Sequence, residues 1–158
     1  MEHIFTYIYE RNIWGNNQKT EYSGSSGEGS SVEFNKEHYI PTVQEFITNN
    51  NIKTVADLGC GDFRCGPLIY DKLDVTYTGY DVYNKIIECH KTNYKPPKYN
   101  FINLDICNQK EDNKEILDGG FRHLSSEYFP LKKYNAKMLK KYYTKEISII
   151  DVNNISIN

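Results

Sequence analysis

Three short apolar runs, each closed by an aspartate, constrain the fold of this chain more than any other feature. They occupy residues 54–57, 75–81 and 99–105, and each predicts a β-strand. The intervals between them hold helix-compatible stretches at 67–72 and 83–93. A β-α-β-α-β alternation of this kind predicts a parallel sheet with right-handed crossovers. The middle of the chain is therefore predicted to be a doubly wound α/β domain.

The flanking segments give weaker signals. Apolar residues of 39–47 recur at the spacing of one helical face, and Pro41 is acceptable in a first helical turn, so a helix is predicted there. Residues 23–31 are too rich in Gly and Ser for a helix or a strand and predict a loop or linker. Towards the C-terminus, the Lys-rich segment 136–143 predicts a helix, and the apolar run 147–150 predicts a strand.

Bulk composition excludes several classes of function. The chain has 158 residues, the size of one domain, and a formal net charge of −2, which provides no overall positive field for a nucleic acid. No apolar run approaches the roughly 18 residues of a membrane helix, and the first residues do not read as a secretory signal, so we expect a cytoplasmic, intracellular protein. The abundance of Asn, Lys, Ile and Tyr is typical of AT-rich genomes, such as those of some parasites or large DNA viruses.

The cysteines do not suggest a metal site. Four are present, at Cys60, Cys65, Cys89 and Cys107, and they form no C-x-x-C pair. A structural zinc site normally shows such pairs with matching histidines. We therefore expect no metal and reduced thiols.

A glycine-rich turn follows the first predicted strand. Residues 57–62 read Asp-Leu-Gly-Cys-Gly-Asp, and Gly59 and Gly61 allow a sharp turn that a ligand can approach closely. In open α/β sheets, ligands bind outside the carboxyl ends of the strands, where this turn would lie. A nicotinamide dinucleotide site favours G-x-G-x-x-G, but the sixth position here is Arg64 and the next glycine is Gly66. A nicotinamide-dependent oxidoreductase is therefore disfavoured.

Aspartates end all three predicted strands. Because the carboxyl ends of parallel strands meet at one rim of the sheet, we expect Asp57, Asp81 and Asp105 to line that rim. Asp81 is placed to accept hydrogen bonds from ribose hydroxyls, and Asp105 to accept one from the exocyclic amine of adenine. Taken singly, Asp81 or Asp105 is equally well explained as a cap for the next helix. The combination of the three favours a nucleoside-containing ligand.

These segments resemble the ordered motifs of class I S-adenosylmethionine-dependent methyltransferases. Residues 55–62 resemble the first motif, 80–82 the second and 104–106 the third. The resemblance implies a three-layer Rossmann-like fold with a parallel-rich sheet, and S-adenosyl-L-methionine as cofactor. It assigns three groups of contacts: Asp57, Gly59, Cys60 and Gly61 to the methionine end, Asp81 with Val82 to the ribose, and Asp105 with Ile106 to the adenine.

The resemblance extends to the N-terminal and distal segments. Residues 8–15 and 23–30 look like the lead-in of one branch of these enzymes, and 118–124 looks like its distal G-x-x-R-x-L segment. Composition alone favours a flexible linker for the Ser/Gly loop, whereas the resemblance implies a lid over the cofactor. Ser25 is the candidate contact from this lid. Trp14 is a weaker candidate, because large rings usually serve the core first.

The chain departs from the family pattern after the third motif. Family members carry a fourth strand with an acidic or amide motif, a helix and a fifth strand before the distal segment, whereas only residues 107–117 fill that interval here. One crossover alone takes about ten residues or more, so both strands are predicted to be reduced or missing. The resulting division is an N-terminal segment with the lid at 1–34, a cofactor-binding core at 35–117 and a distal segment at 118–158.

The shortened interval leaves the catalytic residues unassigned and opens alternatives. The leading hypothesis is methyl transfer to an unidentified acceptor, and the alternative is a catalytically degenerate methyltransferase-like binding or regulatory module. Loss of the two strands would leave the first strand at an open edge, which invites pairing. We expect the C-terminal strand, within 147–151, or a second copy of the chain to cover it. The first arrangement would place Asp151 near the cofactor.

Overall fold

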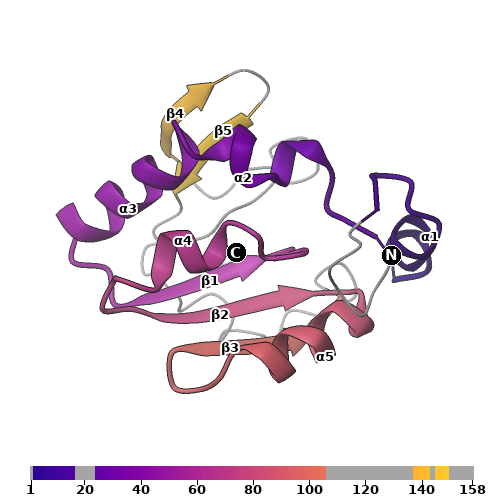
Figure 1. Cartoon of the computed structure of the whole chain (residues 1–158). Coiled ribbons are helices and arrows are strands. Elements are labelled where there is room, and N and C mark those ends of the chain that lie inside the picture. Colours follow the sequence, from indigo (N-terminus) through magenta and orange to yellow (C-terminus); the bar gives the residue numbers. More distant parts are fainter. Residues whose placement is uncertain (1, 17–23, 106–136, 143–144, 150–158) are drawn as a thin grey trace, which may run out of the picture.

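The computed structural model describes residues 2–16, 24–105, 137–142 and 145–149 (Figure 1). Its regular elements alternate between helices and strands in the middle of the chain. In order they are α1 (Glu2–Glu10), the 3-10 turn η1 (Glu28–Ser30), α2 (Val32–Asn35), α3 (Tyr39–Asn49), β1 (Thr54–Leu58), α4 (Gly66–Tyr70), β2 (Thr76–Asp81), α5 (Asn84–Asn93), β3 (Tyr99–Asn103), β4 (Lys137–Tyr142) and β5 (Lys145–Ile149).

The central sheet confirms the predicted α/β class. Its order is β1-β2-β3 and both pairings are parallel. The register places Asp57 opposite Gly79 and Asp81 opposite Asn103. All three strands therefore end at one rim of the sheet, and Figure 1 shows α1 beyond the carboxyl ends of β1 and β2.

Aromatic rings fill the space between the sheet and the crossover helices. Phe63, which follows the glycine turn, lies with its ring centroid 4.7 Å from that of Tyr77 on β2 and 5.2 Å from that of Phe101 on β3. Tyr70 of α4 reaches Tyr77 at 4.8 Å, and His90 of α5 reaches Phe101 at 4.8 Å. The two crossover helices thus cover the same face of the sheet through one aromatic cluster.

Helix α3 forms where the apolar periodicity predicts it. Tyr39, Ile40, Val43 and Ile47 are buried on one face. The helix ends at Asn49, the first residue of an Asn run that stops it. Asn51, with φ 50°, then turns the chain into β1.

The Ser/Gly segment, described from residue 24 on, is a loop that contains one short 3-10 turn, η1, in agreement with the prediction. One prediction outside the sheet is wrong. The predicted helix at 136–143 is strand β4, which pairs antiparallel with β5 across a two-residue connection, Tyr142 facing Lys145. The helix propensity of a short Lys-rich segment is a weak preference, and the strand that follows provides a pairing partner that overrides it. The strand predicted at 147–150 is confirmed as β5.

The expected cover for β1 also needs correction. β5 pairs with β4 in a separate two-stranded sheet and not with β1. Within the described ranges β1 pairs only with β2, so covering of this edge by a second copy of the chain stays a prediction. Asp151, Cys107, the shortened interval and the distal segment at 118–124 lie outside the described residues. None of the described helices combines the length and apolar character that a bilayer span needs.

Candidate functional site

The turn after β1 is held by the neighbouring strand. Gly59 and Gly61 have φ values of 87° and 53°, a region that glycine enters without the penalty imposed by a Cβ atom. The N–H groups of Gly59 and Cys60 both donate to the carbonyl of Tyr80, at 2.8 and 2.9 Å. A Cβ atom built on Gly59 would meet nothing within 4 Å, so the turn faces open space at that point.

Asp81 joins the turn to the start of α5. Its Oδ2 accepts a hydrogen bond from Gly61 N–H at 2.9 Å, and its Oδ1 accepts one from Tyr83 N–H at 3.0 Å. Burial raises the pKa of this carboxyl above its ordinary value, while the two N–H donors act in the opposite direction. Each carboxylate oxygen can accept a second hydrogen bond, so these contacts do not use up the acceptor capacity of Asp81.

His90 supports the same turn from α5. Its Nε2 lies 2.8 Å from the carbonyl oxygen of Gly61, and a ring N–H there donates to that acceptor. Burial lowers the pKa of the buried imidazole, opposed by this hydrogen bond and by the charge of Asp62. The neutral ring therefore holds the carbonyl of Gly61, whereas Asp81 holds its N–H.

Asp57 lies further back along the sheet than Asp81. Its Oδ2 accepts a hydrogen bond of 2.7 Å from the Tyr77 hydroxyl. Burial, followed by the charge of Asp57, raises the pKa of Tyr77, so the phenol stays protonated and keeps donating.

Cys60 is half-buried, and burial together with the charges of Asp81 and Asp57 raises the pKa of its thiol. Such a neutral thiol is a poor nucleophile.

The end of β3 meets the end of β2 through backbone and amide contacts. Leu104 N–H donates to the carbonyl of Asp81 at 2.9 Å. The side-chain amide of Asn103 donates to the carbonyls of Asp81 and Val82, at 3.0 and 2.9 Å. β3 ends at Asn103, so the half-buried Asp105 lies two residues beyond the strand and does not close it as predicted. Ile106 lies outside the described residues.

The Ser/Gly segment packs on the glycine turn. We call residues 24–31 the lid. Ser26 N–H donates to Oδ2 of Asp62 at 2.8 Å, and Asp62 N–H donates to Oγ of Ser26 at 2.8 Å. The Tyr9 hydroxyl and Ser26 Oγ share a further hydrogen bond of 2.7 Å. The segment is thus attached to the turn and does not behave as a linker.

Ser25 and Trp14, the sequence candidates from this region, have other partners. The buried Ser25 hydroxyl donates to the carbonyl of Trp14 at 3.1 Å and accepts from Gly27 N–H at 3.3 Å. The Trp14 side chain is 42% exposed, and its ring packs edge-on against Phe5 and Tyr9. Ser25 therefore stabilises the lid internally, and the neighbouring Ser26 reaches the turn.

A cavity of about 100 Å³ lies between the lid, the turn and α4. Asp57, Gly59, Cys60 and Gly61 line this cavity, whereas Asp81 and Asp105 do not. The reason is register: Asp57 sits opposite Gly79, two residues before Asp81. The site therefore has a cavity beside the turn and, separately, a rim where β2 ends at Asp81 and the chain runs on from β3 to Asp105.

Sequence reasoning missed four side chains that shape this site: Ser26, Asp62, Arg64 and His90. Asp62 and Arg64 follow the glycine turn directly, but nothing in the local pattern pairs them with a segment 36 residues earlier. No cluster of His, Cys, Asp or Glu suited to a metal ion occurs among the residues that the structure describes.

Comparisons with known proteins give structural but not sequence matches. No family model and no curated protein matches the chain. Magnesium protoporphyrin IX methyltransferase (ChlM) from Synechocystis PCC 6803 with bound SAM matches over 94% of each chain, at 11% identity and a TM-score of 0.50. The same enzyme with bound SAH matches 69% of this chain at 14% identity and a TM-score of 0.43. The plantazolicin methyltransferase BpumL matches 50% of it at 26% identity and a TM-score of 0.34.

Because most of these matches cover only part of the compared chains, they support a conclusion about the fold alone. The match spans 53% of the SAH-bound ChlM chain and 34% of the BpumL chain. The SAM-bound ChlM structure, matched along nearly its whole length, provides the argument for the fold. Together with the parallel β1-β2-β3 order and the glycine turn at its carboxyl rim, it shows that the chain has the class I, Rossmann-like fold of S-adenosylmethionine-dependent methyltransferases.

Proposed function

We propose that this protein binds S-adenosyl-L-methionine and transfers its methyl group to an acceptor. One observation carries the proposal: a glycine turn, open to solvent at Gly59, is tied by hydrogen bonds to Asp81 at the carboxyl rim of a parallel sheet. The rim of an open α/β sheet is where such folds bind their ligands. The ChlM structure that shares the fold over 94% of both chains was crystallised with SAM.

The residues present suit this cofactor. Its ribose hydroxyls and its adenine amine are donors, and carboxylate acceptors are present in Asp81 at the end of β2 and in Asp105 two residues beyond β3. Its sulfonium carries a positive charge, and the carboxylates of Asp57 and Asp81 lie beside the turn. The absence of a Cβ atom at Gly59 allows a ligand to approach the backbone there.

Methyl transfer would depend mainly on how the chain positions the cofactor and the acceptor. When bound, the cofactor would supply an electrophilic methyl group: a nitrogen, oxygen or carbon nucleophile of the acceptor attacks the methyl carbon in line, the S–CH3 bond breaks, and S-adenosylhomocysteine leaves. The residues of the chain then bind and orient it: Asp81 at the ribose, Asp105 at the adenine and the Gly59–Cys60–Gly61 turn at the methionine end. Proximity and orientation provide much of the rate enhancement in such reactions. No general base is assigned among the described residues.

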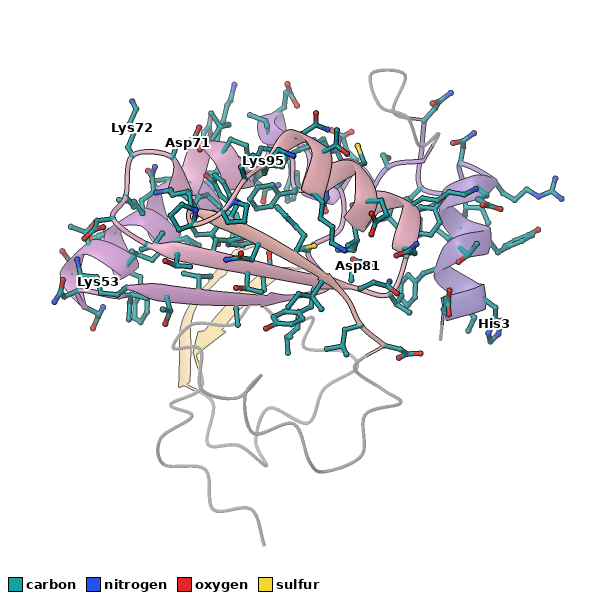
Figure 2. All side chains as sticks on the ribbon, turned by 90° about the horizontal axis from the view of Figure 1, so that it is seen from below. His3, Lys53, Asp71, Lys72, Asp81 and Lys95 are labelled. Atoms are coloured by element: carbon teal, nitrogen blue, oxygen red, sulfur yellow. The ribbon has the colours of Figure 1, made fainter. Side chains whose placement is uncertain are left out.

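Calorimetry with S-adenosylmethionine and its demethylated product tests the proposal. We expect both to bind the wild-type chain, and Asp81→Ala to weaken binding at least about tenfold, a difference of ~1.4 kcal/mol. The matched control is Asp74→Ala, because Asp74 pairs with Lys53 at the other end of the sheet, where Figure 2 labels Lys53. Absence of binding in the millimolar range overturns the proposal.

Transfer is tested separately from binding. Radiolabelled methyl from the cofactor is followed into panels of small molecules, peptides and nucleic acids. Incorporation that disappears in Asp81→Ala and persists in Asp74→Ala supports an enzyme. Cofactor binding without transfer to any acceptor class would instead support a methyltransferase-like binding or regulatory module.

A further inference from the structure

The lid and the glycine turn are joined by a reciprocal pair of hydrogen bonds. Ser26 N–H donates to the Asp62 carboxylate, and Asp62 N–H donates to the Ser26 hydroxyl, both at 2.8 Å. Each residue is donor and acceptor to the other, as in a capping box, but 36 residues apart in the chain. Two backbone segments are thereby held in a fixed mutual position.

Arg64 reinforces this pair. Its Nη2 donates to the carbonyl of Gly27 in the lid at 2.6 Å, and its Nε lies 2.8 Å from Oδ2 of Asp62. The Asp62 side chain is only 2% exposed, so solvent screens this ion pair weakly. The guanidinium therefore spans the junction, with one end on the lid and the other on the turn.

The closeness of the contact leaves little space beneath the lid. A Cβ atom built on Gly61 would lie 2.3 Å from Ser26 Oγ, so the lid rests directly on the turn. The cavity that the lid borders, through Ser26 and Ser30, has a volume of about 100 Å³. Sites for drug-sized ligands usually measure about 300–1,000 Å³. The cavity is therefore too small for the whole cofactor while the lid stays in contact with the turn.

We propose that Ser26 and Asp62 form a latch that holds the lid on the glycine turn and must open before a ligand can enter or leave the cavity. Asp62 acts as a positioning residue, and Arg64 keeps its carboxylate in place. The gating step rests on the proposed function, because it presumes the cofactor as ligand. The latch itself is a property of the free protein.

Single-amide hydrogen exchange by NMR tests the latch without a ligand. Asp62→Ala removes the acceptor of Ser26 N–H, so we expect that amide to exchange at least about tenfold faster. Ser26→Ala removes the acceptor of Asp62 N–H, and that amide should respond in the same way. Asp74→Ala and Thr48→Ala, which alter an exposed carboxylate and an exposed hydroxyl elsewhere, should leave both amides unchanged.

Asp62→Asn is a second, more conservative variant that keeps the test valid if Asp62→Ala does not fold. Asparagine keeps an oxygen acceptor for Ser26 N–H but loses the charge that faces Arg64. We expect its Ser26 amide to exchange at a rate between those of wild type and Asp62→Ala, with an unchanged circular dichroism spectrum. Wild-type exchange rates in folded Asp62→Ala, or in both Asp62→Asn and Ser26→Ala, would overturn the latch.

Stopped-flow fluorescence tests the gating step. Trp14 is the only tryptophan of the chain, and its carbonyl accepts the Ser25 hydroxyl of the lid, so it reports on lid movement. For S-adenosylhomocysteine, we expect association and dissociation rates to rise together by at least about tenfold in Asp62→Ala, with a smaller change in Kd. Unchanged rates, or a rise in dissociation alone, would overturn gating.

The two measurements separate this inference from the proposed function. If the wild-type chain binds no S-adenosylhomocysteine, the proposed function and the gating step fail, and the exchange rates still decide the latch. If the ligand binds and the exchange rates do not respond to Asp62→Ala, the latch fails and the proposed function stands.

Discussion

The backbone N–H of Gly61 donates a 2.9 Å hydrogen bond to Oδ2 of Asp81, which connects the turn after β1 to the end of β2. The same carboxylate accepts Tyr83 N–H at the start of α5. One side chain therefore sets the relative position of a turn, a strand end and a helix start. Because Asp81 is buried, these two donors have no ready access to water in its absence.

Asp81→Ala should lower the free energy of unfolding by about 2–4 kcal/mol. The substitution leaves the N–H groups of Gly61 and Tyr83 without their acceptor, and a buried unsatisfied donor costs about 1–3 kcal/mol. Urea denaturation followed by circular dichroism measures the change. A loss no larger than that of the exposed control Asp74→Ala would show that Asp81 does not organise the turn.

His90 should make stability depend on pH. Burial lowers its pKa in the folded state, whereas the unfolded chain binds that proton at about pH 6.5. The unfolded state therefore holds more protons between the two values, so the stabilisation is present above about pH 6.5 and is lost as pH falls through the folded pKa. Urea midpoints measured from neutral to mildly acid pH should show this decline.

His90→Gln separates this contribution from the rest of the protein. Glutamine can still donate to the Gly61 carbonyl but does not titrate, so the decline in stability below about pH 6.5 should become shallower. The matched control is His3→Gln, the same change at an exposed position on α1, labelled in Figure 2. Equal slopes for wild type and His90→Gln would contradict the assignment.

The sheet could be predicted because its signal is local. The strands at 54–58, 76–81 and 99–103 arise from short apolar runs, and α3 has one apolar face. Composition and hydrophobic period are therefore enough to identify each of these elements without its neighbours. The prediction for 136–143 was wrong because it also relied on the local pattern. That pattern favours a helix, whereas pairing with β5 makes the segment a strand.

The details of the site could not be predicted because they depend on contacts distant in sequence. Ser26 meets Asp62 across 36 residues, and His90 meets Gly61 across 29. The hydrophobic periodicity of the sequence carries no information about such contacts. The pattern also predicts Asp81 as a ligand acceptor without showing that both of its oxygens already hold backbone N–H groups.

Phe63 should be the most sensitive position of the aromatic cluster. Its ring contacts rings from α4, β2, β3 and α5, and it is buried next to Gly66, where a Cβ atom would lie 2.0 Å from Cε2 of Phe63. Phe63→Ala should cost about 3–5 kcal/mol in urea denaturation, and Phe63→Leu less. Leu68→Ala, at a half-exposed side chain, should stay within about 0.5 kcal/mol. Equal losses for Phe63→Ala and Leu68→Ala would contradict this role.

The two glycines of the turn should respond differently to alanine. Both have positive φ, so alanine costs roughly 1–2 kcal/mol of strain at either position. At Gly61 the new Cβ atom would lie 2.3 Å from Ser26 Oγ and push the lid away, whereas at Gly59 it would meet nothing within 4 Å. Gly61→Ala should therefore speed exchange of the Ser26 amide, and Gly59→Ala should not.

Ligand binding should show a different contrast between the same two variants. At Gly59 the Cβ atom projects into open space at the rim, where the proposed cofactor would approach the backbone, so Gly59→Ala should weaken S-adenosylhomocysteine binding at least about tenfold. Its lid amides should keep their wild-type exchange rates, which separates blocked binding from a distorted turn. Wild-type affinity in Gly59→Ala would mean that no ligand approaches the turn there, because a methyl group on that surface could not be tolerated by a bound cofactor.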